Sequence, residues 1–267
     1  MRTQGRQISI ANKGRFNRGQ VIPALGGDIV SAKSFGRKQE VFNEKSRQYA
    51  RAGVITTQSF LRLETLAPTS AQSVFNFNTL DTSGIKTPTE RRLKLADTFT
   101  VTDIAFYLGY GLNATNTPTA AQYTTQKLAT WPNPQITAIG TTQAAELEAI
   151  YNGFLSLRID TTTFIDSIPM RQFYRVGTSQ QGVGSTATNN LPVQINEWPL
   201  SMYGQVPNFP TVELNGQSNI EWSVNLPSAT LCAGANGVGF VNLVLVLGGF
   251  LNQGAATVQR GVQNRLR

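Results

Sequence analysis

Apolar and polar residues alternate in short runs from residue 54 onward, and Pro, Gly, Asn and Thr bound these runs. In residues 154–159, for example, Leu155, Leu157 and Ile159 alternate with Ser156 and Arg158. A period of two residues is typical of a strand that buries one face. The chain shows no strand–helix–strand rhythm and no internal repeat. We therefore expect the body of the chain to be all-β.

Eight strands are predicted, at residues 59–66, 73–77, 98–110, 154–159, 164–174, 212–214, 220–226 and 240–247. The fifth is expected to bend at Pro169. The Asn215–Gly216 dipeptide between the sixth and seventh predicts a hairpin with a loop over residues 215–219. The eighth is apolar on both faces, as expected of a strand that is covered on both sides. Eight antiparallel strands with long connections favour a β-sandwich of the jelly-roll type over an immunoglobulin-like one.

The third predicted strand changes the parity of its apolar positions. These positions are Phe99, Val101, Ile104, Phe106, Leu108 and Tyr110. The first two are odd-numbered and the others are even-numbered. Because successive strand residues point to opposite faces, an inserted residue is needed to keep both halves on the same core. We therefore predict a β-bulge or a bend at Thr102–Asp103.

Three helices are predicted, two of them short elements in the connections of the sandwich. The first covers residues 119–129, which open with the capping-box spacing of Thr and Gln. The second covers residues 142–151, which are rich in Ala, Glu and Leu. The third, at residues 38–52, is amphipathic and has Gly53 as its C-terminal stop.

Charge is concentrated at the two ends of the chain. Residues 1–51 hold eleven Lys and Arg against three acids, and residues 252–267 hold three Arg and no acid. Residues 52–251 carry nine bases against twelve acids. Charged residues make up 14% of the chain, below the roughly 25% that is usual in globular proteins. The basic ends indicate contact with a polyanion, and the weakly charged body suits packing against copies of itself.

Three regions follow: a basic N-terminal arm with a short helix at residues 1–53, a sandwich at 54–251, and a basic tail at 252–267. Residues 1–36 lack a sustained period and are expected to be extended or ordered by a partner. Their spread-out bases suit phosphate contacts that do not read sequence. The alternative is a solubilising tail without a partner. The predicted contacts with nucleic acid or with an inner surface are Arg2, Arg6, Lys13, Arg15, Arg18, Lys33, Arg37, Lys38, Arg260, Arg265 and Arg267.

Few groups are available for catalysis or metal binding. The chain has no His, which removes the commonest general base and metal ligand. The single cysteine, Cys232, excludes an internal disulfide and is expected to be a small buried residue. Asp160 and Asp166 bracket a Thr-rich bend and could be the paired acids of a glycoside-processing enzyme, but acids beside strands usually cap turns or pair with nearby Arg. The glycine-rich run 234–239 lacks the order of a phosphate-binding loop. We predict no enzyme activity, no catalytic residue, no metal and no cofactor.

A signal peptide is not visible in the sequence, because the first residues include no apolar segment. The longest apolar run, residues 240–251, is shorter than the roughly 20 residues that a membrane-spanning helix needs. We therefore expect no membrane insertion.

A basic N-terminal arm followed by about 200 residues of weakly charged, Thr-, Asn- and Gln-rich β-sandwich resembles the jelly-roll coat proteins of icosahedral viruses. The resemblance is one of architecture and covers the whole chain. It implies a structural capsid protein that self-assembles into an icosahedral virion shell. Its arm is then expected to face the interior and to contact neighbouring subunits, other capsid proteins and the genome. The resemblance also implies assembly in the host cytoplasm, and the composition suggests a bacteriophage.

Three tryptophans suggest the alternative function, a virion spike or other carbohydrate-binding jelly-roll module. Trp131 and Trp198 lie beside prolines in predicted loops, where a sugar ring can stack on an indole. Trp222 lies in an alternating strand and is expected in the core.

Overall fold

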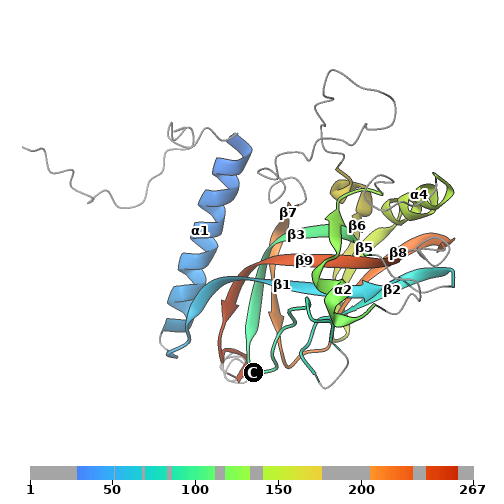
Figure 1. Ribbon diagram of the computed structural model, residues 1–267. Coiled ribbons are helices and arrows are strands. Elements are labelled where there is room, and N and C mark those ends of the chain that lie inside the picture. Colours follow the sequence, from blue (N-terminus) through green and yellow to red (C-terminus); the bar gives the residue numbers. More distant parts are fainter. Residues whose placement is uncertain are drawn as a thin grey trace, which may run out of the picture. The chain divides into compact units, whose positions relative to one another are not determined.

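The computed structural model of the chain describes residues 29–50, 52–67, 70–82, 86–111, 118–132, 141–175, 205–230 and 239–257. Most of these residues form strands, which assemble into two antiparallel sheets with few helices (Figure 1). The predicted all-β class is confirmed, and the two sheets are consistent with a sandwich. Residues 42–267 form one compact unit that holds both sheets, and residues 1–41 form another.

The five-stranded sheet is built around two long central strands. Its members are β1 (Thr56–Leu66), β3 (Thr98–Gly111), β4 (Lys127–Ala129), β7 (Gln205–Asn215) and β9 (Phe240–Asn252). β9 lies between β1 and β3, and both β4 and β7 pair with the other edge of β3. All of these pairings are antiparallel.

The four-stranded sheet holds the remaining strands. In order across the sheet they are β2 (Gln72–Asn78), β8 (Ile220–Thr230), β5 (Phe154–Ile159) and β6 (Thr162–Pro169). β5 has the predicted bounds, and its three alternate apolar residues are buried as expected. Within the described residues, β4 is a ninth strand that the sequence did not predict.

The predicted hairpin at Asn215–Gly216 is wrong. The strands on either side of this turn, β7 and β8, lie in different sheets, so the loop crosses from one sheet to the other. The Gly216 N–H donates to the carbonyl oxygen of Asp97 at 2.9 Å, and a Cβ on Gly216 would overlap the carbonyl oxygen of Lys94. An Asn-Gly dipeptide favours a tight turn in either setting. The partners of the flanking strands are decided by residues far away in the sequence.

β3 contains the predicted bulge. Its register shifts between Val101 and Asp103 against both β9 and β7. Phe99, on one side of the shift, and Phe106, on the other, are both fully buried in the same core. The parity change in the sequence therefore corresponds to a β-bulge, which lets the apolar residues of both halves of β3 point into the same core.

The first predicted connection helix is wrong in its length. α2 spans Ala120–Thr124, and the next residues form β4. The start agrees with the prediction, because the Thr119 N–H donates to Gln122 Oε1 at 2.8 Å. At the other end the Thr124 hydroxyl donates to the carbonyl oxygen of Ala121 at 2.7 Å, and β4 satisfies its backbone by pairing with β3. The second helix is confirmed as α4 (Thr141–Glu148), which continues into the 3-10 helix η2 (Ala149–Asn152).

The strand predicted at residues 164–174 ends at Pro169. A 3-10 helix, η3 (Met170–Phe173), replaces its second half. Proline lacks the N–H that a strand ladder requires, and the side chains of Met170 and Phe173 are fully buried in the core. The bend is therefore a change of element and not a kink within one strand.

The helix predicted at residues 38–52 begins nine residues earlier, because α1 spans Ile29–Ala50. The expectation of extended backbone is therefore wrong for residues 29–36. Once part of a helix has formed, each further residue adds a backbone hydrogen bond, so the unfavourable Gly36 is tolerated. Gly53 follows the helix with a positive φ of 70°, as expected of a stop. The predicted region limits at residues 53 and 251 stay predictions.

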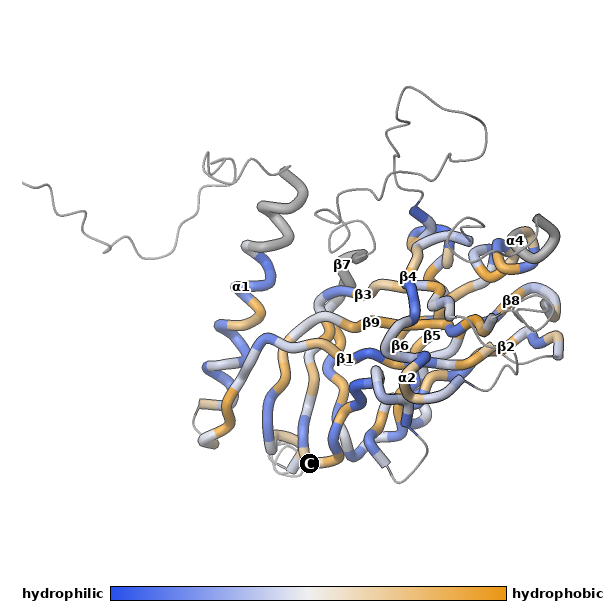
Figure 2. The backbone as a smooth tube through the Cα atoms, viewed as in Figure 1, coloured by the Kyte–Doolittle hydropathy of each residue, from blue (hydrophilic) through white to orange (hydrophobic). Residues whose placement is uncertain are grey.

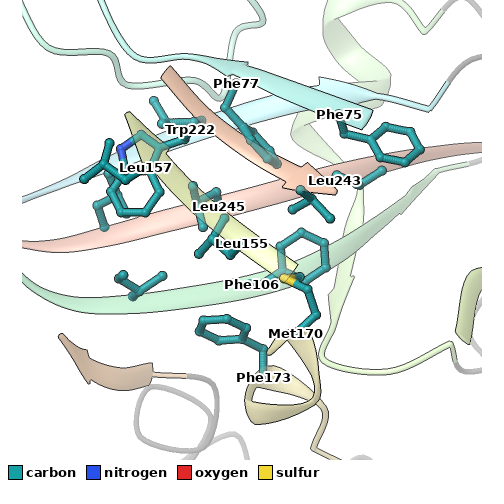
Figure 3. Packing of buried hydrophobic residues seen from close by; sticks show 14 of the residues in the cluster. Phe75, Phe77, Phe106, Leu155, Leu157, Met170, Phe173, Trp222, Leu243 and Leu245 are labelled. Carbon is teal, nitrogen blue, oxygen red and sulfur yellow. The ribbon is translucent and has the colours of Figure 1, made fainter. Parts of the chain in front are cut away.

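Both sheets contribute to one hydrophobic core. Figure 3 shows their side chains pointing toward one another: Phe75, Phe77, Leu155, Leu157 and Trp222 from the four-stranded sheet, and Phe106, Leu243 and Leu245 from the five-stranded sheet. Met170 and Phe173 of η3 join them. Trp222 is fully buried, which confirms its predicted place in the core.

The two sheets differ on their outer faces. β9 is buried on both faces along most of its length, as predicted, and Figure 2 shows it as a largely hydrophobic segment. In the four-stranded sheet, β8 instead alternates buried and partly exposed residues from Ile220 to Leu226. The outer face of the five-stranded sheet is therefore covered, whereas that of the four-stranded sheet is open.

Candidate assembly surfaces and nucleic-acid contacts

Three of the eleven predicted contacts with nucleic acid lie within the described residues. Lys33, Arg37 and Lys38 belong to α1, where Arg37 and Lys38 are partly exposed. The other eight lie outside the described residues: Arg2, Arg6, Lys13, Arg15, Arg18, Arg260, Arg265 and Arg267. A common surface for all of these bases stays a prediction.

The C-terminal part of α1 packs on the outer face of the five-stranded sheet. Lys45 Nζ donates to Glu213 Oε2 at 2.6 Å, and the Tyr49 hydroxyl donates to Glu213 Oε1. The rings of Phe42 and Phe250 lie 5.3 Å apart between centroids. An aromatic contact and two charge-assisted hydrogen bonds thus hold the helix end on strands β7 and β9.

The Glu213 contact continues as a row of hydrogen bonds across four strands. Thr98 Oγ1 donates to Glu213 Oε1 at 3.3 Å, and Asn252 Nδ2 donates to Thr98 Oγ1 at 3.1 Å. The row ends with Thr56 Oγ1, which donates to Asn252 Oδ1 at 2.8 Å. Burial, together with the hydrogen bond to Glu213, raises the pKa of Tyr49. The phenol therefore stays protonated and remains a donor at neutral pH.

A second polar network lies on β1, around the fully buried carboxylate of Glu64. Five side chains donate to it: Arg62 Nε at 2.6 Å, Asn242 Nδ2 at 2.6 Å, Thr89 Oγ1 at 2.7 Å, Thr87 Oγ1 at 3.1 Å and Gln126 Nε2 at 3.3 Å. The donors come from β1, from β9, from the segment before residue 90 and from Gln126, the second residue after α2. A buried carboxylate needs such donors to offset its lost hydration, so Glu64 ties these segments to the sheet.

Glu90 continues this network with a second buried carboxylate. It accepts the backbone N–H of Glu64 at 3.1 Å and that of Thr87 at 2.9 Å, and it pairs with Arg92 Nη2 at 2.7 Å. Neither carboxylate was among the site residues predicted from the sequence. The available signal was the pairing of opposite charges two residues apart, Arg62 with Glu64 and Glu90 with Arg92, since such residues share one strand face.

The outer face of the four-stranded sheet carries mostly small neutral polar groups. Ser156 Oγ and Ser223 Oγ lie 2.8 Å apart, and Asn225 Nδ2 donates to Ser156 Oγ at 2.9 Å. Val74 and Phe154 are both register partners of Asn225, and they are 46% and 44% exposed. This band, which we call the open face, places large apolar groups on a surface that no described segment covers.

Charge is sparse on the open face. β2, β5 and β8 contain only two charged residues, Arg158 and Glu221, and these are register partners across β5 and β8. Phe164 on the neighbouring strand β6 is 56% exposed. Depletion of charge together with exposed aromatic residues is the composition found at the centre of protein–protein interfaces.

The candidate acids and tryptophans form no binding constellation in the described residues. Asp160 has a positive φ of 53° and accepts the Asn219 N–H at 2.8 Å, so it caps a turn. Asp166 lies exposed on β6, and Trp131 is partly buried. Trp198 and Cys232 lie outside the described residues, as does most of the glycine-rich run 234–239.

Within the same residues, no group of three or more carboxylate or cysteine side chains is placed to hold a metal ion. The described helices include none that is both long and apolar enough to cross a membrane. Comparison of the chain with protein-family models, with curated proteins and with solved structures finds no match.

Proposed function

We propose that the two sheets form a jelly roll. If the three-residue β4 is set aside, eight strands remain, and β1 pairs with β9, β2 with β8, β3 with β7, and β5 with β6. The first strand thus pairs with the last, the second with the second to last, and so on inward. This is the pairing of a long antiparallel ribbon wound into two sheets, with β9 against β3 and β8 against β5 where its turns meet.

On this fold, the chain acts as a capsid subunit that assembles into an icosahedral virion shell. Jelly rolls also occur in lectins and cupins, so the fold alone does not select the function. The observation that carries the proposal is the charge partition, with eleven bases and three acids in residues 1–51 and a slightly acidic body. A basic arm beside a weakly charged body suits a subunit that meets a polyanion on one side and its own copies on the others.

The open face supplies a contact for neighbouring copies. The register-paired Arg158 and Glu221 balance each other's charge across β5 and β8, so two copies meet over these strands without strong repulsion, and the exposed Asp166 lies on the neighbouring strand β6. The Ser and Asn side chains of the open face are both donors and acceptors, which lets identical surfaces satisfy one another. Phe154 and Val74 provide the apolar area that such a contact buries.

The arm and the tail face the interior of the shell, where they contact the genome, neighbouring subunits and other capsid proteins. The virion is the site of the mature protein, which assembles in the host cytoplasm. A bacteriophage is the proposed virus type.

Electron microscopy and sedimentation of the full chain test this proposal. Shells of uniform size are the expected result. A variant that lacks residues 1–28 keeps all of α1 and its contacts with Glu213, so it should stay folded but assemble poorly or aberrantly. A monodisperse monomer at high protein concentration, with and without nucleic acid, would overturn the proposal, and so would normal filled shells from the truncated chain.

A further inference from the structure

Two arginines face each other at the edge of the five-stranded sheet. Arg62 on β1 and Arg91 form an isolated antiparallel bridge, with backbone N–H to carbonyl distances of 3.0 and 2.8 Å. Directly opposed residues of an antiparallel pair project from the same face, where like charges destabilise each other. On the open face the corresponding arrangement pairs Arg158 with Glu221. The Arg62–Arg91 pair therefore contributes nothing favourable to the isolated fold.

Arg62 uses only part of its donor capacity. Its Nε donates to Glu64, whose carboxylate is already shared among five donors. Its Nη2 is buried and has no hydrogen-bond partner among the described residues. The Arg62 side chain as a whole keeps 19% of its surface exposed, so it borders solvent although Nη2 itself is covered. Unused donors beside an accessible surface suit an anionic ligand.

Arg91 is exposed and lies over an exposed aromatic ring. Its Cζ is 5.2 Å from the ring centroid of Phe60, and that side chain is 46% exposed. No carboxylate in the described part of the chain forms an ion pair with Arg91. The neighbouring Arg92 is buried against Glu90.

We propose that Phe60, Arg62 and Arg91 form a site for single-stranded nucleic acid on the body of the protein. One backbone phosphate lies beside the two guanidinium groups, and a base stacks on the Phe60–Arg91 pair. Guanidinium groups bind phosphate oxygens through several donors at once, and an aromatic ring beside a cation is the usual platform for an unpaired base. This site is distinct from the arm and does not depend on shell formation.

The test uses the full chain and a fluorescent single-stranded oligonucleotide, titrated by anisotropy at several salt concentrations. Arg91→Ala is matched by Arg171→Ala, which removes an exposed arginine that also lies over an aromatic ring, and Phe60→Ala is matched by Ile55→Ala, which removes another exposed apolar side chain. Arg91→Ala and Phe60→Ala should each weaken binding about five- to tenfold relative to their controls. Arg91→Ala should also reduce the slope of log affinity against log salt by about 0.7, the value for one phosphate on a single strand.

Ultraviolet crosslinking followed by peptide mapping locates the bound strand. Crosslinks to the peptide that holds Phe60 support the site, and crosslinks confined to residues 1–28 overturn it. Affinities of both variants equal to those of their controls also overturn it. Inorganic phosphate is added as a competitor of the labelled oligonucleotide. If it competes as well as unlabelled oligonucleotide at the same concentration of phosphate groups, the site binds free anions and the proposal of a nucleic-acid site is overturned. If Arg91→Ala loses shell assembly but binds the oligonucleotide as tightly as its control, the proposal is overturned. Arg91 would then pair with a carboxylate of a second copy.

Discussion

The two sheets of this protein share one core but have opposite outer faces. The outer face of the five-stranded sheet carries two carboxylates, Glu64 and Glu213, that accept hydrogen bonds from segments packed over the sheet, and Glu90 of one such segment accepts the Glu64 N–H. The outer face of the four-stranded sheet has no described segment over it and presents Ser, Asn and exposed apolar groups. The covered face therefore completes the fold of one subunit except at its β1 edge, where Phe60 and Arg91 are exposed, whereas the open face is available to other molecules.

This difference changes how sequence patterns are interpreted. β8 alternates because one of its faces meets solvent, whereas β9 is apolar throughout because both of its faces are buried. β1 alternates like β8, yet its outward-facing Glu64 is buried beneath other segments. Alternation thus identifies which face of a strand points into the core, but it does not show whether the polar face is exposed to solvent.

Substitution of the central carboxylate of the covered face should have the largest effect. Glu64→Ala leaves the buried Asn242 amide and the Arg62 guanidinium without their acceptor, and we expect a loss of about 3–5 kcal/mol in the free energy of unfolding. Urea denaturation of both proteins measures it. The matched control on the open face is Glu221→Ala, for which we expect a change within about 0.5 kcal/mol. Equal losses for the two variants would contradict the contrast between the faces.

Two phenylalanines offer the next comparison. Phe42→Ala removes the ring that packs on Phe250, so we expect a loss of about 2 kcal/mol in unfolding free energy for this partly buried residue. Phe154→Ala on the open face should lose less than about 1 kcal/mol, because the ring is 44% exposed. In sedimentation experiments the order of the two effects should reverse: Phe154→Ala should lose assembly, and Phe42→Ala should be affected less. Normal shells from Phe154→Ala would remove the open face from the proposed contacts.

A smaller effect is expected at the end of α1. Tyr49→Phe removes the hydrogen bond to Glu213 and should cost about 1.5 kcal/mol at pH 7. Because the pKa of Tyr49 is raised in the folded state, its contribution is complete below about pH 10 and is lost as the pH rises through the folded-state pKa. The alkaline decline in stability should therefore be shallower in the variant, by up to about 1.4 kcal/mol per pH unit.

Denaturation curves between pH 8 and pH 11 measure this decline. The pKa values of Tyr107, Tyr110 and Tyr151 are also raised by burial, so part of the decline should persist in Tyr49→Phe. Parallel pH profiles for the two proteins would show that the Tyr49 hydroxyl is not held by Glu213.

The smallest effect is expected in the polar band of the open face. Ser223→Ala removes a hydroxyl that bonds Ser156 and Asn225, but water can replace it there. Thermal and urea unfolding should change by about 0.5 kcal/mol or less. A loss of 2 kcal/mol or more would mean that this face is covered in the folded subunit.

Several elements of the fold could be predicted because their signals are local. The bulge in β3 follows from the parity of apolar residues within one strand, and β5 was predicted with its observed bounds. Other predictions failed where a distant segment decides the outcome. Asn215–Gly216 favours a turn, yet β7 does not pair with β8 across that turn. It pairs with β3, where the register partner of Asn215 is Thr98, more than a hundred residues earlier in the chain.

The sequence by itself determined the positions of most strands, the two-sided burial of β9, the lack of histidine chemistry and the separation of basic ends from a weakly charged body. Only the tertiary structure decided which strands share a sheet, which outer face is covered, and which charges are buried. The physical reason is the sequence separation over which each feature is decided. Alternation reports the two faces of one strand, whereas the burial of Glu64 depends on Asn242, 178 residues away, and on other segments that return to the same place.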